Sequence, residues 1–507
     1  MGRKNKQKQK SQSTKASAVP ETKELPKANK KEIQDHVKSL LEKCSQPPSS
    51  GAKEFTEFLE IRELIENIRK LQTDQCLPPT RRPEAFPVFI SWLQNHSVNT
   101  EKIKLHEFEG YGYGLQATVE LKEGDMFLAI PRKTMMTVAS AQSTVLSQLI
   151  LEDKILQVMP SVVLALHLLC ERRSQDSPWK PYIDILYMEH TLPDKYSTPL
   201  YFTVEDLEYL KGSPALSDCI SQYRNIARQY AYFYRLLQNE TPATTCLSIK
   251  DCFTYDDYRW AVSTVMTRQN QIPTLDGSKM TFALIPLWDM CNHCNGLITT
   301  DFSLEKDCSE CFALRDFQKD EQIFIFYGAR SNAELLVHNG FVYPENEHDR
   351  TAIKLGISKE DPLFSLKSEV LTRCGLLTSR TFYLHTGSIP VDSDLLLFLR
   401  IFCMDEENLR GHFSGADASE LRQTLGELEK YISKEAEEKA WSFLETRAKL
   451  LLKAYETSIQ EDEELLKKNS LSQNATLAIK LRCCEKGILQ LVIEYASTRI
   501  KSLQSQS

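Results

Sequence analysis

The sequence predicts an α+β protein, in which a β-rich domain is interrupted by a helical insertion and followed by an all-helical domain. Short segments of β character gather in two groups, at about residues 103–130 and 282–327. The stretch between them, at about residues 140–267, has helical periodicity, and so does the chain past Asp349. The length of 507 residues supports this division, because one hydrophobic core seldom extends over so long a chain.

The composition is that of an ordinary globular protein with an uneven charge. Apolar residues make up 41% of the chain and charged residues 26%, which argues against disorder or a fibrous repeat as the main state. Residues 1–31 carry ten Lys or Arg against two Glu, a net +8, so the formal charge of −7 leaves −15 for the remainder. An acidic body binds polyanions poorly, so we expect no nucleic acid partner.

The chain has the features of an intracellular protein. It shows no apolar run near the ~20 residues that span a bilayer and no signal-peptide core, so we expect a cytoplasmic monomer without a membrane partner. The 14 Cys are accordingly interpreted as reduced thiols. Residues 1–31 hold almost no large apolar side chain and are predicted to be a disordered basic tail. A nuclear location directed by this tail stays open, although most such charge runs are merely solvated.

The first elements follow from periodicity and from glycines. Residues 32–100 are predicted to be an N-terminal helical segment, because apolar side chains recur every three or four positions at residues 33–44 and 58–68. A Pro-rich break follows these two helices at residues 77–83. Strands are predicted at residues 103–108, 114–121 and 126–130.

The later elements are marked by helix starts and by alternation. Thr254 with Asp257 resembles a capping box, and the helix that follows places Arg268 and Asn270 at or just beyond its end. Further strands are predicted at residues 282–287, 310–317 and 322–327. The chain is then predicted to be helical to about residue 500, with its last helix started by a capping box at Ser470 to Gln473.

Three short motifs stand out, and each alone has a structural explanation. Gly110, Gly112 and Gly114 alternate, but no strand–turn–helix frame surrounds them, so a plain hairpin is the simpler interpretation. Residues 289–293, Asp-Met-Cys-Asn-His, follow a strand without a Ser or Cys nucleophile partnered beside them. Tyr327 ends the last predicted strand, where an aromatic often belongs to the core.

The order of these motifs resembles that of the SET-domain methyltransferases: an early Gly-x-Gly, an Asn-His after a strand, and a Tyr about thirty residues later. The helical region past Asp349 is similar to the substrate-binding domain of the Rubisco large-subunit methyltransferase class. The resemblance covers roughly residues 75–500. It implies a SET domain at residues 101–328 with a helical insertion at about 140–267, and an all-helical substrate-binding domain at residues 345–500.

Residues 265–273, 284–300 and 327–334 resemble more closely a vertebrate branch of this class that methylates histidine in actin. The branch implies S-adenosylmethionine as cofactor, actin as partner, and transfer to the tele nitrogen of histidine, which gives 3-methylhistidine. The cofactor contacts that it implies are Arg82, Tyr111, Gly112, Tyr113, Arg268, Asp289, Met290, Cys291, Asn292, His293, Asn339, Gly340 and Phe341. The implied substrate contacts are Asn270, Trp288, Tyr327 and Arg330, of which Asn270 and Tyr327 are the catalytic pair.

The sequence departs from this branch in three places. Phe326 stands where Tyr is expected, Asn339 stands where Ser is expected, and an insertion lies around residues 187–191. The two substitutions flank the implied site. They therefore bear on the affinity for peptide and cofactor rather than on the class of reaction.

Cysteine spacing suggests zinc, yet we predict that no metal is bound. Cys291 and Cys294 form one Cys-x-x-Cys pair, and Cys308 and Cys311 form a second, which approaches the spacing of a zinc ribbon. The first pair, however, flanks the Asn-His dipeptide that the resemblance assigns to the cofactor. Thiol ligation of zinc would compete with that assignment.

Asn270 is the residue that separates two acceptor classes. Lysine, with an ordinary pKa of ~10.4, must first lose a proton, whereas histidine at ~6.5 is largely neutral at cytosolic pH and asks mainly for orientation. The Asn270 amide can hydrogen-bond one imidazole nitrogen and leave the other facing the methyl group, while Tyr327 closes the methyl channel and Trp288 forms an aromatic wall. Two alternatives stay open: a lysine methyltransferase of the same fold acting on histone or cytosolic proteins, and a non-catalytic module that grips a partner.

Overall fold

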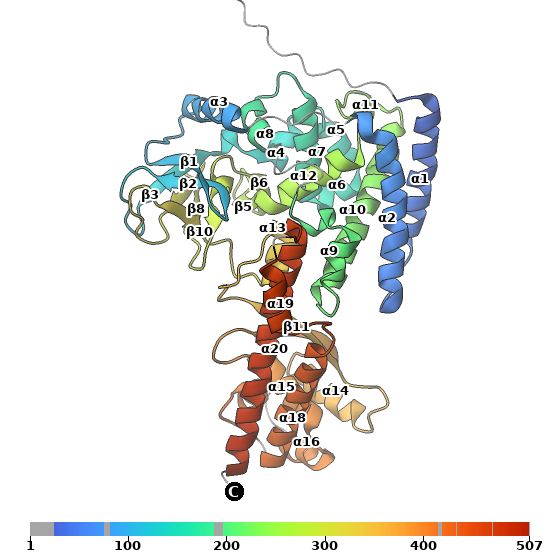
Figure 1. The fold of residues 1–507 in the computed structure, drawn as a ribbon, viewed down its shortest axis with the longest axis vertical. Helices are drawn as coiled ribbons and strands as arrows, with labels where there is room; N and C mark the ends of the chain where they lie inside the picture. The colour runs from blue at the N-terminus through green and yellow to red at the C-terminus, as the bar shows by residue number, and fades with distance from the viewer. Residues whose placement is uncertain are drawn as a thin grey trace, which may run out of the picture.

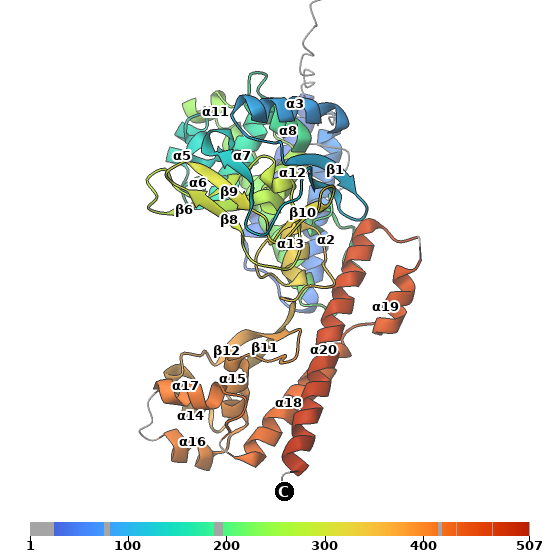
Figure 2. The same ribbon diagram turned by 90° about the vertical axis from the view of Figure 1, so that its left-hand side faces the viewer.

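The computed structural model describes residues 25–75, 82–186, 196–413, 418–431, 433–468 and 470–505 (Figure 1). A larger body holds the first ten strands with helices on one side, and a smaller region lies at the carboxyl-terminal end. Figure 2 shows the long helix α20 (Gln473–Ser505) running from one to the other. The α+β class predicted from the sequence is confirmed. The insertion predicted around residues 187–191 lies outside the described residues.

The N-terminal segment is a helical layer on the larger body. Helices α1 (Lys27–Ser45) and α2 (Ala52–Gln72) bury the two apolar stripes that the periodicity indicated. Because α1 begins at Lys27, the end of the predicted disordered tail is wrong by five residues; residues 1–24 lie outside the described part of the chain. Helix α3 (Arg82–Asn95) begins inside the predicted Pro-rich break, and the patterns found in the sequence do not indicate it. A proline in the first turn of a helix sacrifices no hydrogen bond.

The β-rich domain consists of three small sheets that pair the two strand groups across the insertion. The first sheet has the order β1-β2-β10-β7, the second β3-β9-β8 and the third β4-β6-β5. The bounds are β1 (Ile103–Phe108), β2 (Gly112–Ala117), β3 (Met126–Pro131), β4 (Met136–Thr137), β5 (Gln269–Pro273), β6 (Met280–Leu284), β7 (Asn292–His293), β8 (Thr300–Ser303), β9 (Cys308–Phe312) and β10 (Gln322–Ile325). Three of the predicted strands, at 114–121, 282–287 and 310–317, begin two residues earlier in the structure.

The helical insertion lies between β4 and β5 and ends at the helix that leads into the site. Its helices are α4 (Val138–Gln142), α5 (Ser147–Glu152), α6 (Lys154–Val158), α7 (Pro160–Arg173), α8 (Lys180–Leu186), α9 (Val204–Glu208), α10 (Ala215–Gln238), α11 (Pro242–Thr245) and α12 (Tyr255–Arg268). Thr254 accepts a hydrogen bond from the Asp257 N–H, as predicted. The other half of the predicted capping box, from the Asp257 carboxylate back to the Thr254 N–H, is not formed. The Asp257 carboxylate instead pairs with Arg172 and Arg173, at 3.0 and 2.8 Å.

The carboxyl-terminal region is mainly helical and has its own hydrophobic core. Its elements after α13 (Asn332–Asn339) are β11 (Arg350–Gly356), α14 (Phe364–Arg373), β12 (Ser379–His385), α15 (Ser393–Cys403), α16 (Glu406–Phe413), α17 (Ala418–Gly426), α18 (Lys434–Leu452), α19 (Ile459–Leu466) and α20. The prediction of an all-helical domain omitted the antiparallel pair β11 and β12. The predicted cap of α20 was also misplaced, because Ser472, not Ser470, accepts the hydrogen bond from the Ala475 N–H.

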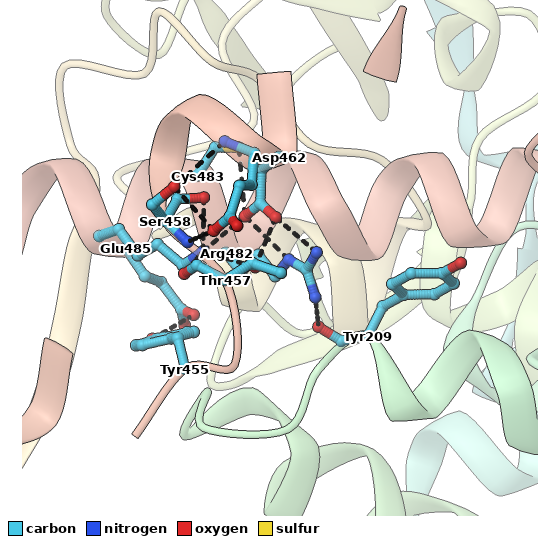
Figure 3. A network of polar contacts seen from close by, with 10 residues as sticks. Tyr209, Tyr455, Thr457, Ser458, Asp462, Arg482, Cys483 and Glu485 are labelled. Carbon is cyan, nitrogen blue, oxygen red and sulfur yellow. Dashed lines mark hydrogen bonds and ion pairs between the residues drawn. The ribbon is translucent and has the colours of Figure 1, made fainter. Parts of the chain in front are cut away.

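A buried network of charged groups joins α20 to the insertion (Figure 3). Asp462, on α19, receives hydrogen bonds from Arg482 at 2.9 Å and from Lys486 at 2.6 Å. Arg482 also donates to the backbone oxygen of Tyr209, which follows α9, at 3.1 Å. The side chains of Asp462 and Lys486 are fully buried, and buried ions persist only with partners of this kind. The network therefore fixes α20 to the insertion.

A neighbouring carboxyl forms a second bridge at the same joint. Glu485 accepts hydrogen bonds from the hydroxyls of Ser213 and Tyr455, both at 2.9 Å. Ser213 belongs to the turn before α10, whereas Tyr455 follows α18.

Among the described residues, no helix is both long and apolar enough to cross a membrane.

Candidate active site

A cavity of about 650 Å³ opens between the end of α12, strand β5, the chain just past β10 and helix α13. Its size is that of a small-molecule site. Its lining residues are Met266, Thr267, Arg268, Gln269, Asn270, Gln271, Phe282, Trp288, Asp289, Cys291, Ile298, Thr300, Ile325, Phe326, Tyr327, Arg330, Glu334, His338 and Asn339. The four predicted substrate contacts are all among them. Their roles stay predictions, but the structure brings the four side chains to one cavity.

The floor of the cavity is a turn held by buried charges. The 3₁₀ turn η4 (Trp288–Met290) follows Leu287, whose φ of +69° reverses the chain after β6. Arg268 donates to the Asp289 backbone oxygen at 2.9 Å and lies 3.3 Å from its carboxylate, which is fully buried. Burial alone would lower the pKa of Arg268, but Asp289 and nearby phenols outweigh it and hold that pKa above its ordinary value. The guanidinium is therefore a permanent charge in the wall of the cavity.

Tyr327 is held at both its backbone and its side chain. Its phenol donates to the Cys291 backbone oxygen at 2.6 Å, and its N–H donates to His293 Nδ1 at 3.2 Å. Burial raises the pKa of Tyr327 above its ordinary value, so the phenol is protonated at neutral pH and acts as a donor rather than as a base.

His293 supports Tyr327 from behind the cavity. Burial lowers the pKa of His293 to about 4, helped by the charges of Arg330 and His348. The imidazole is therefore neutral, and its Nδ1 must carry the lone pair that accepts the Tyr327 N–H. Its ring packs against the rings of Tyr327 and Phe341, with centroids 5.1 and 5.9 Å apart. His293 does not line the cavity.

The opposite wall carries Asn270 and Trp288. Asn270 lies just past the end of α12, as predicted, on strand β5, where it pairs with Ala283 of β6. Its side-chain oxygen accepts the Gln271 N–H at 2.9 Å, which fixes the orientation of the amide. The indole of Trp288 donates to the Thr300 hydroxyl at 3.0 Å, which fixes the plane of the ring.

Arg330 closes the site with help from Asn339. Arg330 donates to the Asn339 side-chain oxygen at 2.6 Å, and Asn339 donates to the Thr267 backbone oxygen at 3.4 Å. Burial lowers the pKa of Arg330 below its ordinary value, because no carboxylate of the described residues lies within ion-pair distance of it. Asn339, where the resemblance leads one to expect Ser, thus tethers Arg330 through a neutral amide.

The remaining predicted cofactor contacts lie in a neighbouring group outside this cavity. Tyr111, Gly112, Tyr113, Met290, Asn292, His293, Gly340 and Phe341 are absent from its lining. Asn292 donates to the Tyr113 backbone oxygen at 3.3 Å. The ring of Tyr111 packs 5.3 Å from that of Phe324, whose strand pairs with Asn292 in parallel. Residues 289–293 connect this group to the cavity. The side chain of Arg82 is outside the described part, so its contact stays a prediction.

Sequence reasoning missed the contribution of α13. Glu334 and His338 line the cavity from this helix, which was not predicted. The capping box of Ser331 and Glu334, observed in the structure, is the local pattern that could have found it.

Within the described residues, no group of three or more His, Cys, Asp or Glu could hold a metal ion. The absence of zinc stays a prediction.

Two family models match the chain. One describes the SET domain and matches residues 112–328; the other describes the substrate-binding domain of the Rubisco large-subunit methyltransferase and matches residues 358–489. The structure of the Rubisco large-subunit methyltransferase bound to AdoMet has a TM-score of 0.66 at 24% identity, covering 83% of this chain and 93% of its own. At that identity the likeness shows the shared fold.

Curated relatives are more similar in sequence. The actin-histidine N-methyltransferase of Gallus gallus is 50% identical over 468 residues, which cover 92% of this chain and 78% of the relative. That of Xenopus tropicalis is 48% identical over 509 residues, covering 100% of this chain and 85% of the relative. That of Homo sapiens is 49% identical over 477 residues, covering 94% and 79%.

Proposed function

The chain belongs to the actin-histidine N-methyltransferase family of SET-domain proteins, and from this premise we propose that it methylates the tele nitrogen of a histidine in actin. The product would be 3-methylhistidine. The methyl donor would be S-adenosylmethionine, whose sulfonium supplies an already activated methyl group. The task of the protein is then to align the acceptor nitrogen behind the methyl carbon and to exclude water.

The observation that carries this proposal is the fixed amide of Asn270 in the wall of the cavity. The Gln271 N–H holds the amide oxygen in place, and a carbonyl oxygen has a second lone pair. An imidazole that donates its Nδ1–H to this oxygen is held in the tautomer whose other nitrogen, Nε2, keeps its lone pair. Nε2 is the tele nitrogen, so an imidazole bound in this way would give 3-methylhistidine.

The described residues fit the cofactor. Arg268 offers a permanent positive charge to the carboxylate of the cofactor. Gly112 has a φ of +68°, and nothing lies within 4 Å of the place where a Cβ would be, so its backbone is open to a ligand near Asn292. Phe282 and Trp288 supply apolar walls beside the acceptor. Tyr327, whose phenol is fixed by its bond to the Cys291 backbone oxygen, would present its ring and a lone pair of its oxygen to the methyl channel.

The test is methylation of actin by the purified chain with isotope-labelled S-adenosylmethionine. Peptide mapping should place the label on a histidine, and amino-acid hydrolysis with chromatographic standards should return 3-methylhistidine. Label on lysine would support the lysine methyltransferase instead. Cofactor binding without label on any actin residue would support a non-catalytic module.

A further inference from the structure

Tyr182, in the helical insertion, lies directly behind the floor of the active site. It belongs to α8, is fully buried, and its hydroxyl donates to the Asp289 carboxylate at 2.6 Å. Its ring stacks on that of Phe89 from α3, with centroids 6.1 Å apart. The packing fixes the ring, and the ring fixes the direction in which the hydroxyl points.

The Asp289 carboxylate receives Tyr182 and Arg268 together. Tyr182 bonds the carboxylate oxygen that lies 3.3 Å from the Arg268 guanidinium. Arg268 also donates to the backbone oxygen of Asp289, so the same guanidinium holds the η4 turn. Because a carboxylate buried without partners is costly, its direction follows these donors. A continuous chain of contacts therefore runs from Tyr182 through Asp289 to the Arg268 charge in the cavity wall.

The hydroxyl of Tyr182 is a permanent donor in this chain of contacts. Burial raises the pKa of Tyr182 well above its ordinary value, and the Asp289 charge raises it further. The phenol therefore stays protonated at neutral pH and does not act as a base there. What remains is orientation of the Asp289 carboxylate.

We propose that Tyr182 is a positioning residue of the methyltransferase site, which acts through Asp289 to hold Arg268 and the η4 turn in the geometry that receives the cofactor. The inference rests on the proposed function, in which Arg268 and Asp289 belong to the cofactor site. The helical insertion would thus take part in cofactor binding, because its helix α8 bears the Tyr182 hydroxyl that bonds Asp289 in the η4 turn. The phenol does not take part in methyl transfer itself.

The decisive variant is Tyr182→Phe, which removes the hydroxyl and keeps the ring. The matched control is Tyr258→Phe, because Tyr258 is also fully buried and its hydroxyl donates to Gln229 at 2.9 Å, away from the cavity lining. Calorimetry should show the dissociation constant of S-adenosylmethionine rising about tenfold in Tyr182→Phe, the scale of a lost hydrogen bond to a charged group. Tyr258→Phe should leave it unchanged. An unchanged constant in folded Tyr182→Phe overturns the proposal.

A double-mutant cycle with Asp289→Asn tests the route of the effect. If Tyr182 acts through Asp289, then Tyr182→Phe should have little further effect on cofactor affinity once Asp289→Asn is present. If Tyr182→Phe weakened cofactor binding equally in both backgrounds, Tyr182 would not act through Asp289, and the proposal would be overturned. A merely structural role would lower the melting temperature alike in both backgrounds. If Tyr182→Phe does not fold, Asp289→Asn alone must weaken cofactor binding. Binding needs no transfer, so these outcomes are separate from a failure to methylate histidine.

Discussion

The phenol of Tyr327 donates a hydrogen bond to the backbone oxygen of Cys291 over 2.6 Å. The bond ties the chain just past β10 to the segment that carries Asp289 and Asn292. It also fixes the direction of the phenol at the cavity wall, where the raised pKa of Tyr327 keeps it protonated. The reacting groups thus meet a phenol oxygen whose position and protonation state are both set by the fold.

Replacing Tyr327 with Phe should lower kcat at saturating cofactor by about tenfold, because the hydrogen bond from Tyr327 to Cys291 beside the reacting centre, worth about 1.4 kcal/mol, is lost. The ring stays, so the melting temperature should move little. Steady-state kinetics and thermal unfolding check the two parts. A kcat equal to that of the wild type would show that the phenol only supports the Cys291 segment.

Replacing Asn270 with Phe should lower histidine methylation and raise the relative acceptance of lysine. The amide oxygen that orients imidazole is lost, and an aromatic rebuilds a narrow apolar channel suited to a deprotonated amine. The comparison uses two actin-derived peptides that differ only by His or Lys at the target position. The control is Asn270→Asp, which keeps an acceptor oxygen and should retain more histidine activity than Asn270→Phe. An unchanged His-to-Lys preference would remove Asn270 as the selector.

The pH profile should report the substrate imidazole. Only neutral imidazole has the lone pair that attacks the methyl, so kcat/KM should rise with pH to a plateau, with a midpoint near ~6.5. His293 adds no second break in this range, because burial lowers its pKa to about 4. Initial rates between pH 5.5 and 9 check this. A rise that continues toward the ordinary lysine pKa of ~10.4 would instead indicate a lysine acceptor.

Replacing Asn292 with Ala should weaken cofactor binding by about tenfold while the fold survives, because one polar contact among the predicted cofactor-binding residues is lost. The variant removes the donor to the Tyr113 backbone oxygen. Asn295→Ala is the matched control, because Asn295 also donates to a backbone oxygen, that of Glu345 at 2.7 Å, but is not among the predicted cofactor contacts. Calorimetry that gives both variants wild-type affinity would refute the assignment of Asn292.

Glu485 should make stability fall as pH rises toward neutrality. Burial raises the pKa of Glu485 to about 7 from 4.5, and the charges of Asp349 and Asp218 add to the rise against the hydrogen bonds from Ser213 and Tyr455. Between pH 4.5 and 7 the folded protein therefore holds a proton that the unfolded chain has lost, and stability declines as pH rises through that window.

Replacing Glu485 with Gln removes this titration. Its stability relative to the wild type should therefore grow from pH 5 to pH 8, by up to about 3 kcal/mol. Urea unfolding at the two pH values measures the difference. The control is Glu463→Gln, at an exposed position on α19, which should show no such trend. A pH-independent difference for Glu485→Gln would contradict a buried titration.

Local patterns in the sequence predicted those parts of the fold that local physics decides. The buried stripe of α1 and the start of α12 at Thr254 follow from helical spacing and from a cap, which need only a few neighbours. Strands β11 and β12 were missed although β11 alternates strictly, with Thr351, Ile353 and Leu355 buried. The long helices around them dominated the periodicity. Their pairing across α14 brings together residues that no short window contains.

The candidate site divides in the same way. Asn270, Trp288 and Tyr327 belong to recognisable segments, and the structure brings them to one cavity, although their roles stay predictions. Tyr182 could not have been found from sequence, since it lies more than one hundred residues before Asp289 and only the packing of α8 brings the two together. Asn339 lines the cavity and tethers Arg330, which the sequence does not indicate, and its contact to the cofactor stays a prediction. A side chain that acts through another leaves no local pattern.

Helix α20 sits in two hydrophobic cores at once, and this restricts how the chain can vary in length. Ala478 and Leu481 pack in the core of the larger body, whereas Ile488 and Val492 pack in the core of the carboxyl-terminal region. One residue inserted between Leu481 and Ile488 would turn the second set by about 100° relative to the first, so one core would lose its side chains. Insertions of about seven residues, two full turns, would restore the facing but move the two regions about 10 Å apart. Length differences among relatives should therefore fall in the loops and not in this part of α20.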